Sequence, residues 1–310
     1  MLSGGQVDYT DQFTLRFEHA VTLKREWEPS GRGTAVVVPG SPVSLYLQLR
    51  PELVGHPALL DLRVRRALAH AIDRTALNDG LFDGLGTPTD TWVSPSVPFS
   101  PEVERLITHY PLDVNRAVEL MGEAGFARNP DGYFADASGR QFHVDFAVQA
   151  SSEIERMQTL LSDTWRRAGF EVRATVMAPQ LFQQLETRHT VPGLAYANAS
   201  AERTFLSSEI GTAGNRWSGS NRPGWVNADY DRVYQAWNTT PDDTERGRYV
   251  AQLMALISQN LPVYSLYFAL GIHTWVAALH GPTQGRQATG YGETSPATSA
   301  YWNIQDWYFA

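Results

Sequence analysis

The chain has 310 residues, 43% of them hydrophobic, and 25 basic against 33 acidic residues leave a formal charge of −8. This length allows one large or two ordinary domains with a real core. An acidic balance without long runs of like charge argues against a nucleic-acid footprint and offers an anionic membrane surface no basic patch. The absence of cysteine excludes disulfides, thiolate zinc sites and cysteine nucleophiles.

The first part of the chain is irregular in sequence. Residues 1–33 have no clean hydrophobic period, so we expect a loop-rich entry there. The N-terminus has no basic segment followed by an apolar one, and no later window approaches 18 uninterrupted apolar residues. The sequence therefore predicts neither a signal peptide nor a membrane span.

Two strands and a helix are predicted next. Thr34–Val38 and Val43–Leu49 are rich in β-branched and apolar residues, and Pro39-Gly-Ser-Pro42 predicts a turn between them. Asp61 is a suitable N-cap for a helix with an apolar stripe, which consists of Val64, Leu68, Ala71 and Ile72. We expect this stripe to be buried and the helix to be structural.

The segment from Gly84 to Pro111 is rich in proline and predicts a long ordered loop. Asp113 then begins a short helix that Gly125 ends. Asp136-Ala-Ser-Gly139 predicts a hairpin turn before the alternating strand Phe142–Ala150.

Helices and strands alternate in the second half. Helices are predicted from Ser152, paired with Glu155 in a capping box, to Gly169, and over Pro179–Arg188, with strands at Val172–Val176 and Gly193–Ala199 between and after them. A further helix runs from Thr240 to Asn260, followed by the apolar strand Val263–Leu270 and an aromatic tail. This succession implies crossover connections, and hence an α/β fold with a mixed sheet.

Motifs of catalysis and of metal binding are missing. The sequence has no Gly-x-Ser-x-Gly elbow, no His-Glu-x-x-His motif and no phosphate-binding glycine loop, and its eight histidines form no i,i+4 pair. We therefore expect no catalytic residue, no metal and no cofactor.

The helix pattern Asp61-Leu-Arg-Val-Arg-Arg-Ala-Leu-Ala-His-Ala-Ile-Asp-Arg74 closely resembles the signature helix of the family 5 extracellular solute-binding proteins, the oligopeptide, dipeptide and nickel binders of ABC importers. Further landmarks resemble that family in the same order. They are Gly5-Gln-Val-Asp8, Asp113–Phe126, the hairpin at Tyr133–Val148, Ala168-Gly-Phe170 and Asn260–Tyr267.

The resemblance implies a type II periplasmic-binding-protein-like α/β lobe with partial strands of another lobe. Residues 34–280 would form the second, ligand-binding lobe, whereas 1–33 and 281–310 would be remnants of the first lobe and hinge. The implied function is that of the substrate-binding component of an ABC importer, not an enzyme. Its partners would be a peptide or other small polar solute, a membrane permease and the missing N-terminal lobe.

The implied location is extracytoplasmic, either periplasmic or lipid-anchored at the cell surface. Two alternatives remain open, namely a ligand-sensing domain of a transcription regulator and a hydrolase on a related α/β scaffold. The acidic charge and the lack of a helix-turn-helix pattern count against the first, and fold resemblance alone does not prove function.

The ligand site is expected on the loop after the strand near residue 196. Peptide-binding relatives carry an acidic residue there for the ligand's amino group, and Asn198 replaces it here. A buried ammonium needs a charged partner, so we expect a ligand other than a standard dipeptide, with an anionic or hydrogen-bond-accepting end. The candidate ligand-binding residues are Tyr196, Asn198, Arg216, Trp217, Arg222 and Trp225. Alternatively, the two arginines brace the loop and the two tryptophans fill the core.

Overall fold

The computed structural model describes residues 6–11, 14–197, 202–282 and 304–310. Its main sheet has seven strands, in the order β1-β9-β2-β8-β6-β7 with β3 paired to β9. The strands are β1 (Tyr9–Thr10), β2 (Gly33–Leu47), β3 (Thr87–Pro88), β6 (His143–Gln149), β7 (Glu171–Met177), β8 (Leu194–Ala197) and β9 (Val263–Val276). Strand β6 is parallel to β7 and β8, and the other pairs are antiparallel. The predicted α/β fold with a mixed sheet is therefore confirmed.

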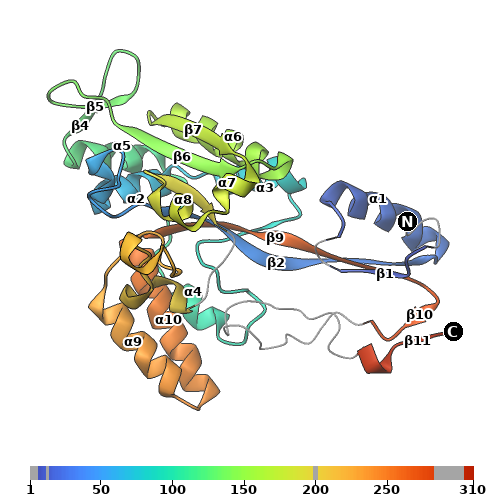
Figure 1. The fold of residues 1–310 in the computed structure, drawn as a ribbon. Helices are drawn as coiled ribbons and strands as arrows, with labels where there is room; N and C mark the ends of the chain where they lie inside the picture. The colour runs from blue at the N-terminus through green and yellow to red at the C-terminus, as the bar shows by residue number, and fades with distance from the viewer. Residues whose placement is uncertain (1–5, 12–13, 198–201, 283–303) are drawn as a thin grey trace.

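Helices cover both faces of this sheet. They are α1 (Phe17–Ser30), α2 (Leu62–His70), α3 (Arg74–Phe82), α4 (Ser100–Leu106), α5 (Val114–Glu123), α6 (Ser152–Arg167), α7 (Pro179–Phe182), α8 (Leu185–Thr190), α9 (Ala228–Thr239) and α10 (Asp243–Asn260). In Figure 1, α2, α3, α5 and α6 lie above the sheet, whereas α4, α9 and α10 lie below it. Small strand pairs join β4 (Phe126–Arg128) to β5 (Phe134–Asp136) and β10 (Leu279–His280) to β11 (Tyr308–Phe309).

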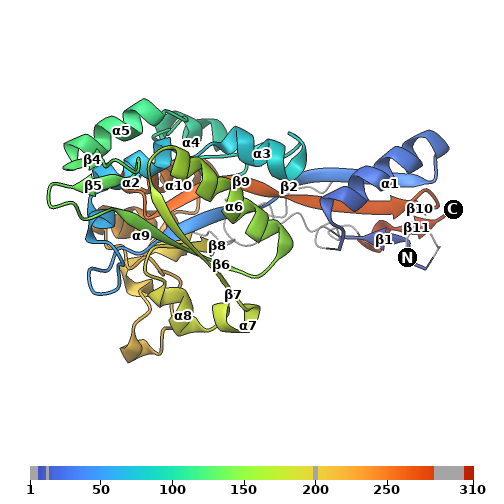
Figure 2. The ribbon, with the colours of Figure 1, turned by 90° about the horizontal axis from the view of Figure 1, so that it is seen from above.

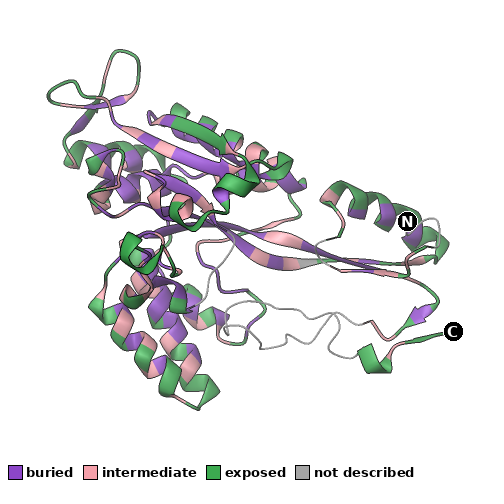
Figure 3. Ribbon diagram, in the orientation of Figure 1, coloured by how far each residue is buried: buried purple, intermediate pink, exposed green. Residues whose placement is uncertain are grey.

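Each face of the sheet has its own core, because successive side chains of a strand point to opposite faces. On β2, Leu45 and Leu47 belong to the core shared with α2, α3, α5 and α6, which we call the upper core. Tyr46, between them, belongs to the lower core with α4, α9 and α10. The outer sides of the helices remain exposed (Figure 3).

Strands β2 and β9 form a long antiparallel ribbon that leaves the main body. They pair from Gly33 opposite Val276 to Tyr46 opposite Val263. The far end of the ribbon carries α1, β1, β10 and β11, and both chain ends lie there (Figures 1 and 2). The rings of Tyr9 and Trp307 are 5.0 Å apart. The described segments from the two ends of the chain therefore meet.

The helix predicted over 61–74 is shorter than expected, because α2 ends at His70 and α3 begins at Arg74, but α2 is structural, as predicted. Asp61 caps α2 by accepting a hydrogen bond from the Arg63 amide at 2.8 Å. The predicted stripe is fully buried, with Val64 and Leu68 both 0% exposed. Arg65 donates to main-chain carbonyls, namely those of Leu59, Leu60 and Asn260.

Helix α1 corrects the expectation of a loop-rich entry. Its buried residues Ala20, Leu23 and Trp27 are three and four positions apart and therefore lie on one face of the helix. Leu23 and Trp27 pack against Val276 of the ribbon. The stripe is narrow and most of the helix is polar, because α1 covers a ribbon only two or three strands wide. Because so few positions are apolar, the sequence of α1 shows no clear helical period of hydrophobic residues.

The predicted turn at Pro39–Pro42 is also wrong, because β2 runs continuously through it. The register shifts between Pro39 and Pro42, as in a β-bulge, so an extended backbone accommodates both prolines. A Cβ on Gly40 would lie 2.9 Å from the Ala269 carbonyl oxygen, so glycine permits this close approach.

Other boundaries differ from the prediction. The supposed loop 84–111 contains β3 and α4, the single helix at 179–188 is α7 followed by α8, and α9 was not predicted. The turn at Asp136 forms, with its Oδ1 accepting from the Ser138 and Arg140 amides. However, β5 pairs as a strand with β4, and a bridge from Ala135 to Gln141 with a hydrogen bond from the Phe142 amide to the Phe134 carbonyl connects it to the segment before β6.

His56 is a buried, uncharged histidine at the edge of the upper core. Its side chain is 5% exposed, and its Nδ1 accepts a hydrogen bond from the Ala58 amide at 3.2 Å. Burial lowers its pKa to about 4, helped by the positive potential of His143 and Arg140. Asp136 opposes this shift and Arg173 adds to it.

Protonation of His56 is therefore expected to destabilise the fold. Between about pH 6.5 and about pH 4 the unfolded chain binds a proton that the folded chain does not, so the free energy of unfolding falls as pH falls. Urea unfolding at about pH 7 and about pH 5 should show a smaller acid loss for His56→Gln than for the unmodified protein. The exposed His19→Gln serves as the control, and equal acid losses in all three proteins would contradict the assignment.

Candidate ligand-binding site

The carboxyl ends of β6, β7 and β8 lie at one edge of the sheet, because these strands are parallel. The N-terminus of α6 follows β6 at this edge. Ligands of open α/β sheets bind outside the carboxyl ends of the strands. This edge is the first part of the candidate site.

Tyr196 lies on β8 next to that edge. It is opposite Leu45 of β2 and packs against the upper core. Burial raises its pKa to about 12, and the negative charge of Glu153 adds to the shift. Asn198, the next candidate, lies outside the described residues.

Arg222 lies on the other face of the sheet. Its guanidinium carbon is 5.5 Å from the ring centre of Tyr46, which belongs to the lower core. Burial lowers the pKa of Arg188 on α8, and the positive charge of the nearby Arg222 lowers it further. Neither guanidinium has a carboxylate within 4 Å in the described part of the chain. Two cations without a counterion could accept an anionic group.

Arg50 holds the loop that carries Arg222. Its guanidinium donates to the Gly211, His189 and Arg222 carbonyls and to the Gln48 side chain. Burial lowers the pKa of Arg50. The alternative left open by the sequence was loop bracing by Arg216 and Arg222, but the buried Arg50 supplies these carbonyl contacts.

Trp217 lies against this arginine, and Arg216 points into solvent. The Arg50 guanidinium carbon is 5.8 Å from the Trp217 ring centre, and the His189 ring is 6.0 Å from it. Arg216 is exposed. Arg216 and Trp217 both have positive φ, at 56° and 58°, so the backbone of this tight turn is in the left-handed region at both residues.

Trp225 is part of the lower core. It is 7% exposed and packs edge-on against Tyr230 at 5.3 Å and Phe205 at 6.3 Å. The fully buried Asn221 fixes this segment by donating to the carbonyls of Phe205, Leu206 and Trp225. These contacts match the packing alternative that the sequence left open for Trp225.

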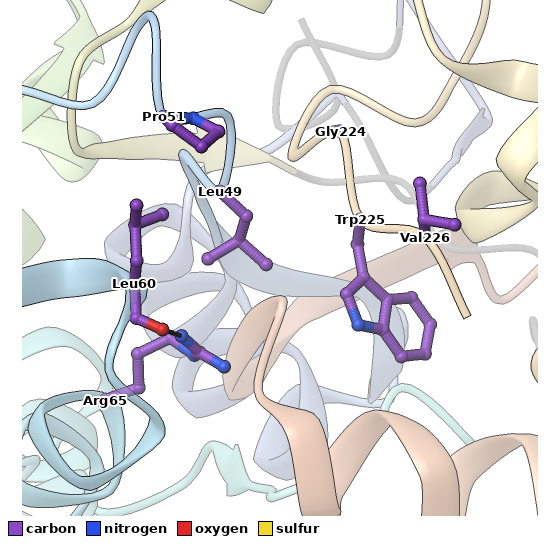
Figure 4. A pocket seen from close by; sticks show the side chains of 7 residues that line it. All are labelled: Leu49, Pro51, Leu60, Arg65, Gly224, Trp225 and Val226. Atoms are coloured by element: carbon purple, nitrogen blue, oxygen red, sulfur yellow. Dashed lines mark hydrogen bonds between the residues drawn. The ribbon is translucent and has the colours of Figure 1, made fainter. Parts of the chain in front are cut away.

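A cavity of about 370 Å³ lies beyond the C-terminal end of β2, next to the Arg222 loop, whose Gly224 and Trp225 form part of its wall. Its lining residues are Leu49, Pro51, Leu60, Arg65, Gly224, Trp225 and Val226 (Figure 4). It follows the C-terminal end of β2, whereas the ribbon leaves the body at the N-terminal end of β2. Its single cationic group, Arg65, already donates to three carbonyls. The candidate site therefore remains the sheet edge at Tyr196 and the Arg222 loop, which the cavity borders.

In the part of the chain that the structure describes, no group of three or more His, Cys, Asp or Glu side chains could hold a metal ion. In the same ranges no helix is both long and apolar enough to cross a membrane.

Comparison with known families decides the classification. The family model described as "Bacterial extracellular solute-binding proteins, family 5 Middle" matches residues 1–249. The chain belongs to the family 5 extracellular solute-binding proteins. Members of this family are extracytoplasmic binding proteins rather than enzymes.

Known family 5 relatives are distant and longer. Heme-binding protein A of Haemophilus influenzae is 22% identical over 249 residues, which are 78% of this chain and 39% of that protein. The oligopeptide-binding protein of Thermus thermophilus, complexed with a pentapeptide, has a TM-score of 0.76 at 22% identity over 98% of this chain and 54% of its own. NikZ of Campylobacter jejuni, in complex with Ni(L-His), has a TM-score of 0.73 at 18% identity over 99% of this chain and 58% of its own. These structures show the fold, and this chain spans about half the length of its relatives.

The family 5 chain thus brings the candidate residues together only in part. Trp217 and Arg222 gather around Arg50, whereas Tyr196 lies on the opposite face of the sheet. The sequence did not single out Arg50, although a basic residue directly after a predicted strand was an available signal.

Proposed function

We propose that this chain is the second lobe of a substrate-binding protein that captures a peptide or other small polar solute for an ABC permease. Residues 34–280 form that lobe in this proposal, and 1–33 with 281–310 complete the first lobe together with a preceding part of the same protein. The permease recognises the closed form, and the protein works on the extracytoplasmic side, in the periplasm or anchored by lipid.

One observation carries the proposal. The β2–β9 ribbon connects the main body to a small unit in which both ends of the chain meet. A connection of two strands between compact units suits hinge closure, because few backbone angles need to change. The bulges between Pro39 and Ser44 give that ribbon a point of bending.

The ligand contacts proposed for this lobe lie along the β8 edge and the Arg222 loop. Arg222 and Arg188 supply positive charge with no carboxylate of the described residues close to them, and Trp217 supplies an apolar wall. These groups suit a carboxylate or another hydrogen-bond acceptor on the solute.

Replacement of Arg222 by alanine tests this assignment in the full-length protein. The solute retained on purification is identified by mass spectrometry, and its affinity is measured by calorimetry. We expect Arg222→Ala to weaken binding more than tenfold, about 1.4 kcal/mol, because an anion-pairing group is removed. Arg232→Ala, at a side chain 73% exposed on α9, should leave affinity unchanged. Unaltered affinity in the Arg222 variant would move the anion contact elsewhere.

A further inference from the structure

The cavity beyond the C-terminal end of β2 has the size of a small-molecule site. Its volume is about 370 Å³, and sites for small ligands span about 300–1,000 Å³. Leu49, Leu60 and Val226 contribute apolar walls (Figure 4). The cavity lies at the end of β2 away from the ribbon, so a molecule bound here would not lie between the two units that the ribbon joins.

Arg65 brings a buried positive charge with a spare donor to this cavity. It is 8% exposed, and four of its five N–H groups are donated to the carbonyls of Leu59, Leu60 and Asn260. The fifth N–H, on Nη2, has no hydrogen bond among the described residues. Figure 4 shows the tip of the guanidinium pointing into the space between Arg65 and Trp225.

Trp225 supplies a second donor to the same space. It is 7% exposed, and its hydrogen bonds with Asn221 use only the main-chain atoms of Trp225. Its indole N–H therefore has no hydrogen bond in the part of the chain that the structure describes. The indole nitrogen lies on the side of the ring that faces Arg65 (Figure 4). Buried donors without an acceptor cost free energy, which a bound acceptor would recover.

The surroundings of the cavity are positively charged. Arg50 packs behind its wall, since a Cβ on Gly224 would lie 2.5 Å from Cγ of Arg50. Burial lowers the pKa of both Arg50 and Arg65, while Glu52 opposes the shift at Arg50 and Asp61 opposes the shift at Arg65. In the described ranges neither guanidinium has a carboxylate within 4 Å. An anion in the cavity would balance this charge.

A carboxylate matches these features, because its two oxygens only accept hydrogen bonds and it carries the opposite charge. We propose that the cavity binds a small carboxylic acid with an apolar body, whose carboxylate accepts hydrogen bonds from Arg65 and Trp225. This ligand is distinct from the captured solute, and the inference does not rest on the proposed function. Because Trp225 belongs to the Arg222 loop, the bound acid would tie that loop to α2.

The test measures matched probes on the full-length protein by calorimetry. The probes are phenylacetate with phenylacetamide, and hexanoate with hexanamide, because each amide keeps the shape of its acid and loses the charge. We expect at least one acid to bind at least tenfold more tightly than its amide. Trp225→Phe keeps an aromatic ring and should weaken acid binding severalfold, and Arg65→Met should abolish the preference. Arg63→Met, at a side chain 47% exposed on the same helix, should keep it.

Two variants at the cavity wall serve as the test if Arg65→Met does not fold. Val226 is 68% exposed, so its substitution leaves the core intact. Val226→Asp should weaken acid binding severalfold relative to Val226→Asn, because it places a negative charge beside the carboxylate. The affinity for the amide should be the same in both variants.

The remaining outcomes count against the inference. Equal affinity for an acid and its amide in both pairs, or no binding of either acid in the millimolar range, overturns it. Equal acid binding by Val226→Asp and Val226→Asn together with unaltered binding by Trp225→Phe also overturns it. The acid should bind equally well before and after removal of the retained solute, and competition between the two would overturn the separate site.

Discussion

Replacing Leu68 by alanine is expected to lower the free energy of unfolding by about 2–5 kcal/mol. Leu68 is 0% exposed in the upper core, and the Trp165 indole donates to its carbonyl at 3.0 Å. The loss combines lost burial with a cavity that the rigid packing cannot close. Urea unfolding measures it.

The matched control is Leu85→Ala. Leu85 is 64% exposed, so its truncation should change the free energy of unfolding by less than about 0.5 kcal/mol. An unchanged unfolding curve for Leu68→Ala would mean that the α2 stripe is not part of the core.

The buried pair of Arg74 and Asp90 should give an effect of similar size. Their nitrogen and oxygen are 2.7 Å apart, with side chains 14% and 19% exposed. Arg74 also donates to the carbonyls of Thr89 and Ser265, which ties α3 to β9 and to the segment after β3. We expect Arg74→Met to lower the free energy of unfolding by about 3 kcal/mol, because the half-buried Asp90 loses its guanidinium partner and keeps only the His109 ring, whose Nδ1 is 3.2 Å from it.

A double-mutant cycle separates this pair from simple packing. Asp90→Asn in the Arg74→Met background should recover part of the loss, because the orphaned charge is removed. Arg105→Met, in an exposed pair with Glu102, should change the free energy of unfolding by less than about 1 kcal/mol. Additive effects at Arg74 and Asp90 would show that the two side chains are not coupled.

The sequence predicted the elements in which local signals agree. At Asp61 a cap, a stripe of apolar residues and good helix formers all indicate α2. Local sequence patterns likewise indicate the strands β6, β7 and β8. Helix α1 failed because its burial is set by a narrow ribbon that sequence does not reveal. Strand β2 failed because its two prolines are held by β9, a partner more than two hundred residues away along the chain.

The candidate site was predictable in place but not in detail. Tyr196 and Arg222 are close in sequence, yet the alternation of β8 and the path of the following loop put them on opposite faces of the sheet. Trp217 and Trp225 look alike in sequence, but only Trp225 enters a core. Arg50 comes from the segment after β2, and its hydrogen bonds to the Gly211, His189 and Arg222 carbonyls place it at the site.

The position of the solute in a crystal structure of the full-length protein tests the central claim most directly. The account predicts a solute enclosed between two lobes, in contact with the sheet edge at the ends of β6 and β8 and with residues of the first lobe. A solute in the cavity between Leu49 and Val226, or one that contacts this lobe alone, would contradict it.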